Sequence, residues 1–219
     1  MAKLKAGVLI SGRGSNLLAL LKACAAPEFP AEIALVICNR ADAAGLAHPV
    51  RYGVPARVIP HRDYPDRESF DRVVSAALEA AGVELVCLGG FMRIFSSWFP
   101  AHWANRIINI HPSLLPAFRG LHVQQQAIDA GARVSGATVH MVTQDLDAGP
   151  IVAQAAVPVH QGDTADTLSA RILKAEHELY PLVLRWFGER RVRIVPQPGK
   201  PDRVVIDGIA ADAPVLWRP

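Results

Sequence analysis

Two periodicities alternate along the first half of the chain. Short apolar runs rich in β-branched residues predict buried strands at 8–10, 33–38, 57–59, 85–88 and 107–110. Between them, apolar residues recur at helical spacing and predict helices over 17–24 and 70–81, the second ended by Gly82. Continuous apolar strands separated by helices are typical of a parallel sheet with both faces covered, so this half predicts an α/β fold.

The second half has a different pattern. Residues 134–142 and 151–159 form longer, partly alternating runs, with turn residues at 147–150 between them. They predict an antiparallel strand pair that extends the same, mostly parallel twisted sheet. A long helix is expected over 164–187, followed by a small hairpin from 192–195 and 204–206. Without a repeat or a linker, we expect one domain over 1–188, with 189–219 as a C-terminal extension packed on it.

Composition excludes several classes of protein. The 219 residues are 51% hydrophobic and 20% charged, as in an ordinary soluble globular protein. The net charge is only +3, and Lys and Arg are scattered until 190–193, so we expect no nucleic-acid partner. No apolar stretch reaches membrane-spanning length, and the stretch at 6–10 is too short for a signal peptide core. The three cysteines have neither metal-ligand nor redox spacing, which indicates buried, reduced thiols in a cytoplasmic protein.

A glycine loop at 11–16 (SGRGSN) separates the first strand from the first helix. Glycines allow close backbone approach, and the start of a helix presents free N–H groups to an anion. A dinucleotide fingerprint would need a third glycine at position 17, where the chain has Leu17. The loop therefore indicates either a simpler phosphate cradle or a tight turn with a helix cap.

Asn109 and His111 stand at the end of the fifth expected strand, where their side chains point to the same side. Ligands of open α/β sheets bind at the carboxyl ends of the strands. An amide donor can stabilise an oxyanion and an imidazole can manage protons, as acyl transfer to an amine requires. Asp147, in the later turn, is a candidate to hold and charge the imidazole. The alternative for His111 is a structural histidine whose hydrogen bonds are made within the protein.

Other chemistry finds little support in the sequence. No serine lies in a nucleophile-elbow motif, and the histidines lack zinc spacing, so neither covalent catalysis nor a metal is expected.

On the long helix, Glu176 falls at the edge of the apolar stripe, about 70–80° from its centre. From there its carboxylate can reach a cleft or belong to a solvated flank.

Five segments together resemble the phosphoribosylglycinamide formyltransferases, the folate-dependent transformylases of purine synthesis. They are GSN at 14–16, GGFMRIF at 89–95, NIHPSLLP at 109–116, LDAGP at 146–150 and EHELYP at 176–181, in the order of the family. The resemblance runs from about residue 6 to 186. It implies a Rossmann-like formyltransferase fold, and 10-formyltetrahydrofolate as co-substrate with no metal. It also implies glycinamide ribonucleotide as the substrate that is formylated in de novo purine biosynthesis.

The resemblance also implies roles for residues. The catalytic residues would be Asn109, His111 and Asp147. The ribonucleotide would be bound by Gly14, Ser15, Asn16, Gly90, Met92 and Glu176, with Glu176 on the glycinamide amine. The folate would be bound by Met92, Arg93, Ile94, Phe95, Val142, Thr143, Asp145 and Asp147. Supporting positions would be His122, Thr138 and His140. The chain departs from the family pattern at Arg13, at 123–126 and in the tail after Gly188.

Three alternatives remain open. Methionyl-tRNA formyltransferase shares the Asn–x–His–x–Ser pattern but has an added C-terminal domain, for which the residues after 188 are expected to be too few. Formyltetrahydrofolate hydrolase usually has an N-terminal regulatory domain, whereas here the first strand begins almost at once. A non-catalytic nucleotide-binding module would explain the glycine loop but not the Asn–His–Asp set. We expect small-molecule substrates only, no membrane partner, and a monomer or a homodimer.

Overall fold

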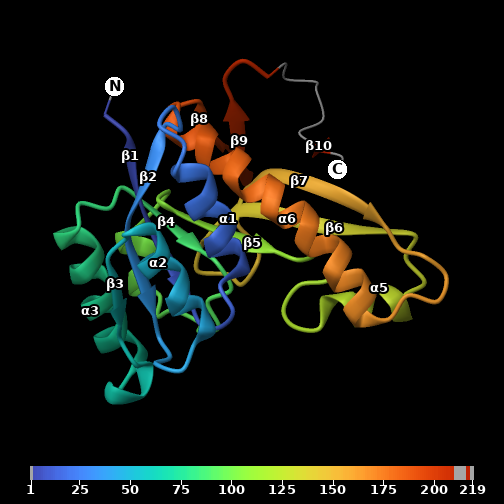
Figure 1. The fold of residues 1–219 in the computed structure, drawn as a ribbon. Helices are drawn as coiled ribbons and strands as arrows, with labels where there is room; N and C mark the ends of the chain where they lie inside the picture. The colour runs from blue at the N-terminus through green and yellow to red at the C-terminus, as the bar shows by residue number, and fades with distance from the viewer. Residues whose placement is uncertain (1, 210–215, 218–219) are drawn as a thin grey trace.

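A computed structural model describes residues 2–209 and 216–217 (Figure 1). Its main sheet has eight strands, in the order β10-β7-β6-β5-β4-β1-β2-β3. The strands are β1 (Leu4–Ile10), β2 (Ala31–Cys38), β3 (Ala56–Val58), β4 (Leu85–Leu88), β5 (Ile107–His111), β6 (Val134–Met141), β7 (Ile151–Pro158) and β10 (Leu216–Trp217). Strands β1 to β5 pair in parallel, whereas β6 runs antiparallel to both β5 and β7. The expected mostly parallel sheet with an antiparallel extension is confirmed.

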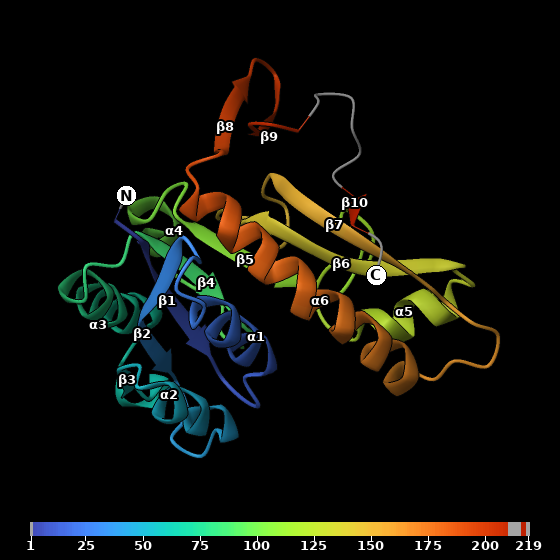
Figure 2. The ribbon, with the colours of Figure 1, turned by 45° about the horizontal axis from the view of Figure 1, so that its top comes forward.

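Helices cover both faces of this sheet (Figure 2). They are α1 (Ser15–Cys24), α2 (Ala47–Tyr52), α3 (Arg67–Ala80), α4 (Trp98–His102), α5 (Val123–Asp129) and α6 (Ala165–Gly188). Short 3-10 helices span Ala44–Leu46 and His61–Asp63. Buried residues of α1 and α6 form one hydrophobic cluster with the sheet, and those of α3 and α4 form a second. Two separate clusters are what a sheet covered on both faces requires.

The long helix α6 begins where the sequence predicts. Thr164 is its N-cap and forms a capping box with Thr167, which satisfies backbone donors that the first turn leaves free. Leu168, Ile172, Leu179 and other members of the predicted stripe are buried against α1 and the sheet. Within the described residues, no helix combines the length and the apolar character needed to cross a membrane.

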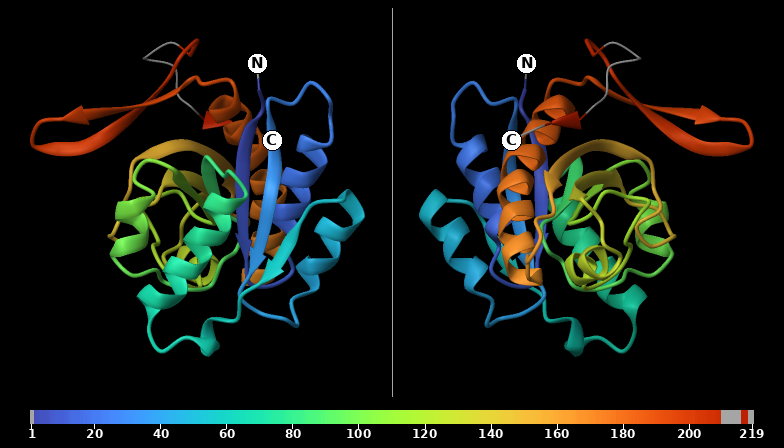
Figure 3. Two further views of the ribbon diagram at one scale, coloured as in Figure 1. Left: turned by 90° about the vertical axis from the view of Figure 1, so that its left-hand side faces the viewer. Right: turned by 90° about the vertical axis from the view of Figure 1, so that its right-hand side faces the viewer.

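The structure has a hairpin after α6. β8 (Val192–Gln197) and β9 (Lys200–Ile206) pair antiparallel as a separate two-stranded sheet, which projects from the main body (Figure 3). Ile206 is buried in the first cluster, so the hairpin is anchored at its base. The sequence did not predict β10, which pairs in parallel with β7. The division of the chain at residue 188 stays a prediction.

Candidate active site

The order of the strands creates a switch point between β1 and β4. From β1 the chain adds β2 and β3 on one side, then crosses back to add β4 and β5 on the other. The loops that follow β1 and β4 therefore diverge at the carboxyl edge, where ligands of such sheets bind. Backbone and side chain of Ser11 join the two loops: its N–H donates to the Gly90 carbonyl at 3.2 Å, and its Oγ accepts from Met92 N–H at 2.7 Å.

The glycine loop ends at Gly14, which is the N-cap of α1 in a left-handed conformation (φ 67°). A side chain there would be strained, and its Cβ would lie 3.0 Å from Gly45 Cα, so the position requires glycine. The helix start has no side-chain cap and no acidic residue in its first turn. Its first N–H groups are therefore left to bind an anion.

Asn16 and Glu176 join this loop to α6. Asn16 Nδ2 donates to Glu176 Oε2 at 2.7 Å, and both side chains are buried. Burial raises the pKa of Glu176 from 4.5 to about 7, and the hydrogen bond from Asn16 opposes this shift. Asn16 Oδ1 has no partner among the described residues. A second polar group, such as a ligand hydroxyl or ammonium, would satisfy it.

Tyr180 shows how close Glu176 lies to the strand ends. It stands one helical turn after Glu176, and its hydroxyl lies 3.1 Å from the carbonyls of both Leu88 and Ile108. These carbonyls precede Gly89, the first residue after β4, and Asn109, two residues before the end of β5. Glu176 is therefore on the α6 side of the same carboxyl edge, and it is not on a solvated flank.

The antiparallel pairing of β5 with β6 assembles the predicted catalytic pair. Asn109 lies opposite His140, and His111 lies opposite Thr138. His140 Nδ1 is 2.9 Å from the Met141 carbonyl, which can only accept, so Nδ1 carries the proton. Its Nε2 then accepts from Asn109 Nδ2 at 3.2 Å. Burial lowers the pKa of His140, which keeps this ring neutral and leaves one Asn109 N–H free for a substrate.

His111 faces Asp147 across the site. His111 Nε2 donates to the Phe118 carbonyl at 2.9 Å, which leaves Nδ1 to face Asp147 Oδ2 at 3.6 Å. The same Oδ2 accepts from Gly120 N–H at 3.0 Å, and Oδ1 lies 3.8 Å from His140 Nε2. With Nε2 donating to the backbone, the carboxylate of Asp147 faces the other ring nitrogen, Nδ1, and is placed to orient the ring.

The backbone around Asp147 is held in an unusual shape. Asp147 has φ 49°, in the left-handed region that few residues other than glycine adopt. Two residues on, a Cβ at Gly149 would lie 1.9 Å from the Met141 carbonyl oxygen, so only glycine fits. Such local strain is often found at functional sites, and here it aims the carboxylate at His111.

The segments predicted to bind the folate come from two loops. Phe95, after β4, and Val142, after β6, pack on the same α3/α4 cluster, which brings these loops together. Met92, Ile94 and Leu146 are 71%, 57% and 57% exposed. Exposed apolar side chains on adjoining loops form a surface that an aromatic ligand would cover. Arg93, Thr143 and Asp145 lie on the same loops.

The supporting residues have different surroundings. Thr138 Oγ1 donates to the Ser113 carbonyl at 2.7 Å and accepts from Leu115 N–H at 3.0 Å, so it fixes the loop after β5. The peptide bond between Leu115 and Pro116 in this loop is cis. His122 is exposed at the left-handed N-cap of α5 and makes no side-chain cap. Within the described residues, no cluster of His, Cys, Asp or Glu could hold a metal ion.

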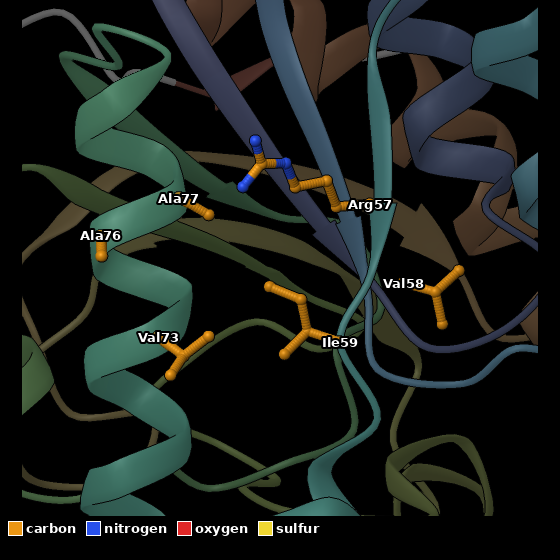
Figure 4. Close-up of a pocket in the computed structure, with 6 residues that line it drawn as sticks. All are labelled: Arg57, Val58, Ile59, Val73, Ala76 and Ala77. Atoms are coloured by element: carbon orange, nitrogen blue, oxygen red, sulfur yellow. The ribbon is translucent and has the colours of Figure 1, made fainter.

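A hollow of about 400 Å³ lies elsewhere, between β3 and α3 (Figure 4). It is lined by Arg57, Val58, Ile59, Val73, Ala76 and Ala77. None of these side chains is a carboxylate, imidazole or thiol, and β3 is the edge strand farthest from β6 and β7 among β1 to β5. The hollow therefore lacks the groups for acid–base chemistry, which gather at β5 and β6.

Comparison with known proteins agrees with this geometry. The family model described as formyl transferase matches residues 4–184. Phosphoribosylglycinamide formyltransferase of Escherichia coli is 41% identical over 94% of this chain and 98% of its own length. The trifunctional purine biosynthetic protein adenosine-3 of Gallus gallus is 47% identical over 88% of this chain, which spans only 19% of that longer protein.

Solved structures give the same result. The glycinamide ribonucleotide transformylase 1 of Symbiobacterium toebii superposes with a TM-score of 0.88 at 48% identity, covering 93% of this chain and 94% of its own. The phosphoribosylglycinamide formyltransferase of Anaplasma phagocytophilum gives 0.87 at 42% identity, covering 99% and 98%. From the family match and these identities over nearly the whole chain, the protein belongs to the formyl transferase family.

Proposed function

We propose that this protein transfers the formyl group of 10-formyltetrahydrofolate to the amine of glycinamide ribonucleotide, in de novo purine biosynthesis. The observation that carries the proposal is the pair of contacts at the end of β5: Asn109 with neutral His140, and His111 with Asp147. They supply an amide donor and an imidazole held beside a carboxylate, the groups that formyl transfer to an amine requires. The names of relatives that match over nearly their whole length support the same reaction.

The ribonucleotide phosphate binds at the start of α1. Backbone N–H groups of Gly14, Ser15 and Asn16 point there and attract the anion together with the helix dipole. The glycinamide arm extends from the phosphate loop past Gly90 and Met92 toward Asn109. This direction follows from the hydrogen bonds of Ser11, which hold the loops after β1 and β4 together.

Glu176 is expected to bind the glycinamide amine. Its buried carboxylate would accept a hydrogen bond from the ammonium, and its pKa of about 7 lets it exchange a proton with an amine near neutral pH. A second candidate partner for Glu176 is the ribose of the substrate, whose hydroxyls lie between the phosphate and the amine. The hydrogen bond between Glu176 and Asn16, a residue of the phosphate loop, favours this partner. Substrate analogues without the ribose hydroxyls separate the two partners. If loss of the hydroxyls lowers the affinity of the wild type but not that of Glu176→Gln, Glu176 binds the ribose.

The reaction begins when the free amine attacks the formyl carbon, and negative charge develops on the formyl oxygen. Asn109 donates its free Nδ2–H to this oxygen, while His140 fixes the amide. His111, which Asp147 faces, donates or relays protons at the same centre. The amine proton leaves through water near Asp147. The bond between the formyl carbon and the folate nitrogen then breaks, that nitrogen takes up a proton, and tetrahydrofolate departs.

The folate lies on the exposed apolar surface between the loops after β4 and β6. Met92, Ile94 and Phe95 cover it from one side, and the loop from Val142 through Asp145 from the other. Asp147, at the end of that loop, adjoins the formyl group. Arg93 supplies a positive charge for an acidic part of the folate.

We also propose that the protein works in the cytoplasm, as a monomer or a homodimer, without nucleic acid or a membrane. Its free thiols support a reducing compartment: Cys38 and Cys87 are buried, and Cys24 is partly buried. Burial raises the pKa of Cys24 to about 12 and that of Cys87 further, so both stay protonated and unreactive.

The test is incubation of purified protein with 10-formyltetrahydrofolate and glycinamide ribonucleotide, followed by the mass of the product. Formylated ribonucleotide should form without added metal or nucleoside triphosphate. Release of formate without amine formylation would instead identify a hydrolase, and formylation of methionyl-tRNA alone would identify the tRNA enzyme. Product that requires ATP and formate and ignores formyl-folate would refute the proposal.

A further inference from the structure

The loop that follows β4 is held at both of its ends. At its start, Ser11 bonds the Gly90 carbonyl and the Met92 N–H, as described above. At its end, Asp71 Oδ2 accepts from Ser96 N–H at 2.6 Å and from Ser96 Oγ at 2.7 Å. The residues between these anchors are the part of the loop expected to contact the folate.

Asp71 is an unusual residue for a purely structural contact. Its side chain is fully buried on α3, and burial raises its pKa although Ser96 and nearby arginines oppose the shift. Its Oδ1 accepts no hydrogen bond from the described residues. A buried carboxylate with a free oxygen is costly, whereas a neutral side chain could accept from Ser96 at lower cost.

Arg93 lies within the influence of this carboxylate. Its guanidinium stands 5.0 Å from the ring centroid of Phe70, the neighbour of Asp71 on α3. The positive charge of Arg93 lowers the pKa of Asp71, so the two groups attract each other. Arg93 Nε is buried and has no hydrogen-bond partner among the described residues. The start of α3 thus contacts the loop at Arg93 and at Ser96.

We propose that Asp71 is a positioning residue for the formyl-folate. It touches no reacting atom, but it fixes Ser96 by two hydrogen bonds and orients Arg93 through its charge. This sets the shape of the loop from Met92 to Phe95 before the folate arrives, which lowers the ordering cost of binding. The inference rests on the proposed function, because the loop is expected to contact folate only in that reaction.

The experiment measures both substrates in four variants. Asp71→Ala removes the acceptor and the charge, Asp71→Asn keeps an acceptor for Ser96, and Ser96→Ala removes one of the two bonds. The matched control is Glu79→Ala on the same helix, whose carboxylate contacts Ser75 of α3 and His102 of α4 but not the loop. For each protein, steady-state kinetics give kcat and both KM values, and calorimetry gives the Kd for tetrahydrofolate alone.

We expect Asp71→Ala to raise the KM for formyl-folate and the Kd for tetrahydrofolate by on the order of tenfold or more, as for loss of hydrogen bonds to a charged group. The KM for the ribonucleotide should stay within about twofold. Asp71→Asn should recover part of the loss, Ser96→Ala should lose less than Asp71→Ala, and Glu79→Ala should match the wild type in both KM values.

Equal increases in both KM values, or an unchanged Kd for tetrahydrofolate, would overturn the role of Asp71. If Asp71→Ala does not fold, Asp71→Asn and Ser96→Ala carry the test, and wild-type folate affinity in both refutes it. A wild type that binds tetrahydrofolate but does not formylate the ribonucleotide would refute the proposed function alone. In that case the calorimetry still decides the role of Asp71.

Discussion

Replacing Glu176 with glutamine removes one ionisable group from the interior and changes the shape of the side chain very little. The amide oxygen can still accept from Asn16 Nδ2, which now bonds the carboxylate at 2.7 Å. The substitution therefore isolates the effect of charge from that of packing. The side chain is only 6% exposed, so solvent does little to screen that charge.

The magnitude follows from the pKa of Glu176, which burial raises from 4.5 to about 7 in the folded protein. At about 1.36 kcal/mol per pKa unit, ionisation of this group in the folded state costs about 3 kcal/mol more than in the unfolded chain. Below pH 4.5 the carboxyl is protonated in both states, and the full stability is present. As the pH rises through 7, this part of the stability is lost.

Urea unfolding of wild type and Glu176→Gln between pH 5 and pH 8 measures this difference. Relative to the variant, the wild type should lose about 2–3 kcal/mol of unfolding free energy over this range. Glu178→Gln, which removes an exposed carboxylate of the same helix, is the matched control and should show no comparable change. If the difference between wild type and Glu176→Gln is the same at pH 5 and pH 8, the reasoning from burial is wrong.

The activity of Glu176→Gln should fall, although its stability at pH 8 should rise relative to the wild type. If Glu176 bonds the substrate, Glu176→Gln should reduce kcat/KM for the ribonucleotide by more than about tenfold, because hydrogen bonds to a charged group contribute about 1.5–3 kcal/mol. A variant that is more stable at pH 8 and yet less active would show that the buried carboxylate is kept for binding. An unchanged kcat/KM would leave Glu176 with a structural role only.

Four further variants test the remaining groups. Asn109→Ala should lower kcat by on the order of 10²–10³, as for other oxyanion donors; a change only in KM would contradict its role. Asp147→Asn should lower kcat by roughly 10²–10⁴. Since the pair acts as a unit, kcat of Asp147→Asn/His111→Ala should be little lower than that of the worse single variant. If pH-dependent kinetics show that the losses of the two single variants add in the double variant, this coupling is contradicted. Gly14→Val should raise the KM of the ribonucleotide strongly while the folate KM changes little, with circular dichroism as the check that the strained turn still folds; equal increases would contradict separate sites.

The sequence predicted the strands well where apolar runs are continuous. Asn109 and His111 could be placed at a strand end because β5 is a short apolar run that stops at a proline. Short helices such as α4 and α5 were not predicted, because five to seven residues show too little periodicity. Their positions depend on packing against neighbouring helices.

Glu176 shows the limit of a helical-wheel argument. Its angle from the apolar stripe placed it at the edge of the buried face, with a solvated flank as the alternative. In the structure it is buried, because α1 packs along this side of α6 and covers the edge position. Spacing within one helix cannot reveal a second helix that packs against it. Only the structure could therefore decide whether Glu176 lies on a solvated flank or in a cleft.

Other parts of the site leave no trace in the sequence. The Phe118 carbonyl and the Gly120 N–H, which orient His111 and Asp147, are backbone groups, so no side chain marks them. Ser11 is similar, since its role depends on the crossing of two loops that are about 80 residues apart, at Ser11 and Met92. The sequence can therefore name the reacting side chains but not the groups that hold them.

The antiparallel strand β6 explains why this site needs more than a parallel sheet. A further parallel strand would bring only another loop to the carboxyl edge, whereas β6 runs back along β5 and places interior strand residues there. His140 and Thr138 thereby stand in register with Asn109 and His111 on a rigid element. The turn that leads from β6 into β7 then returns Asp147 to the same edge, within 3.6 Å of His111. Two strands and one strained turn thus hold the donor, the imidazole and its carboxylate in fixed positions before any substrate binds.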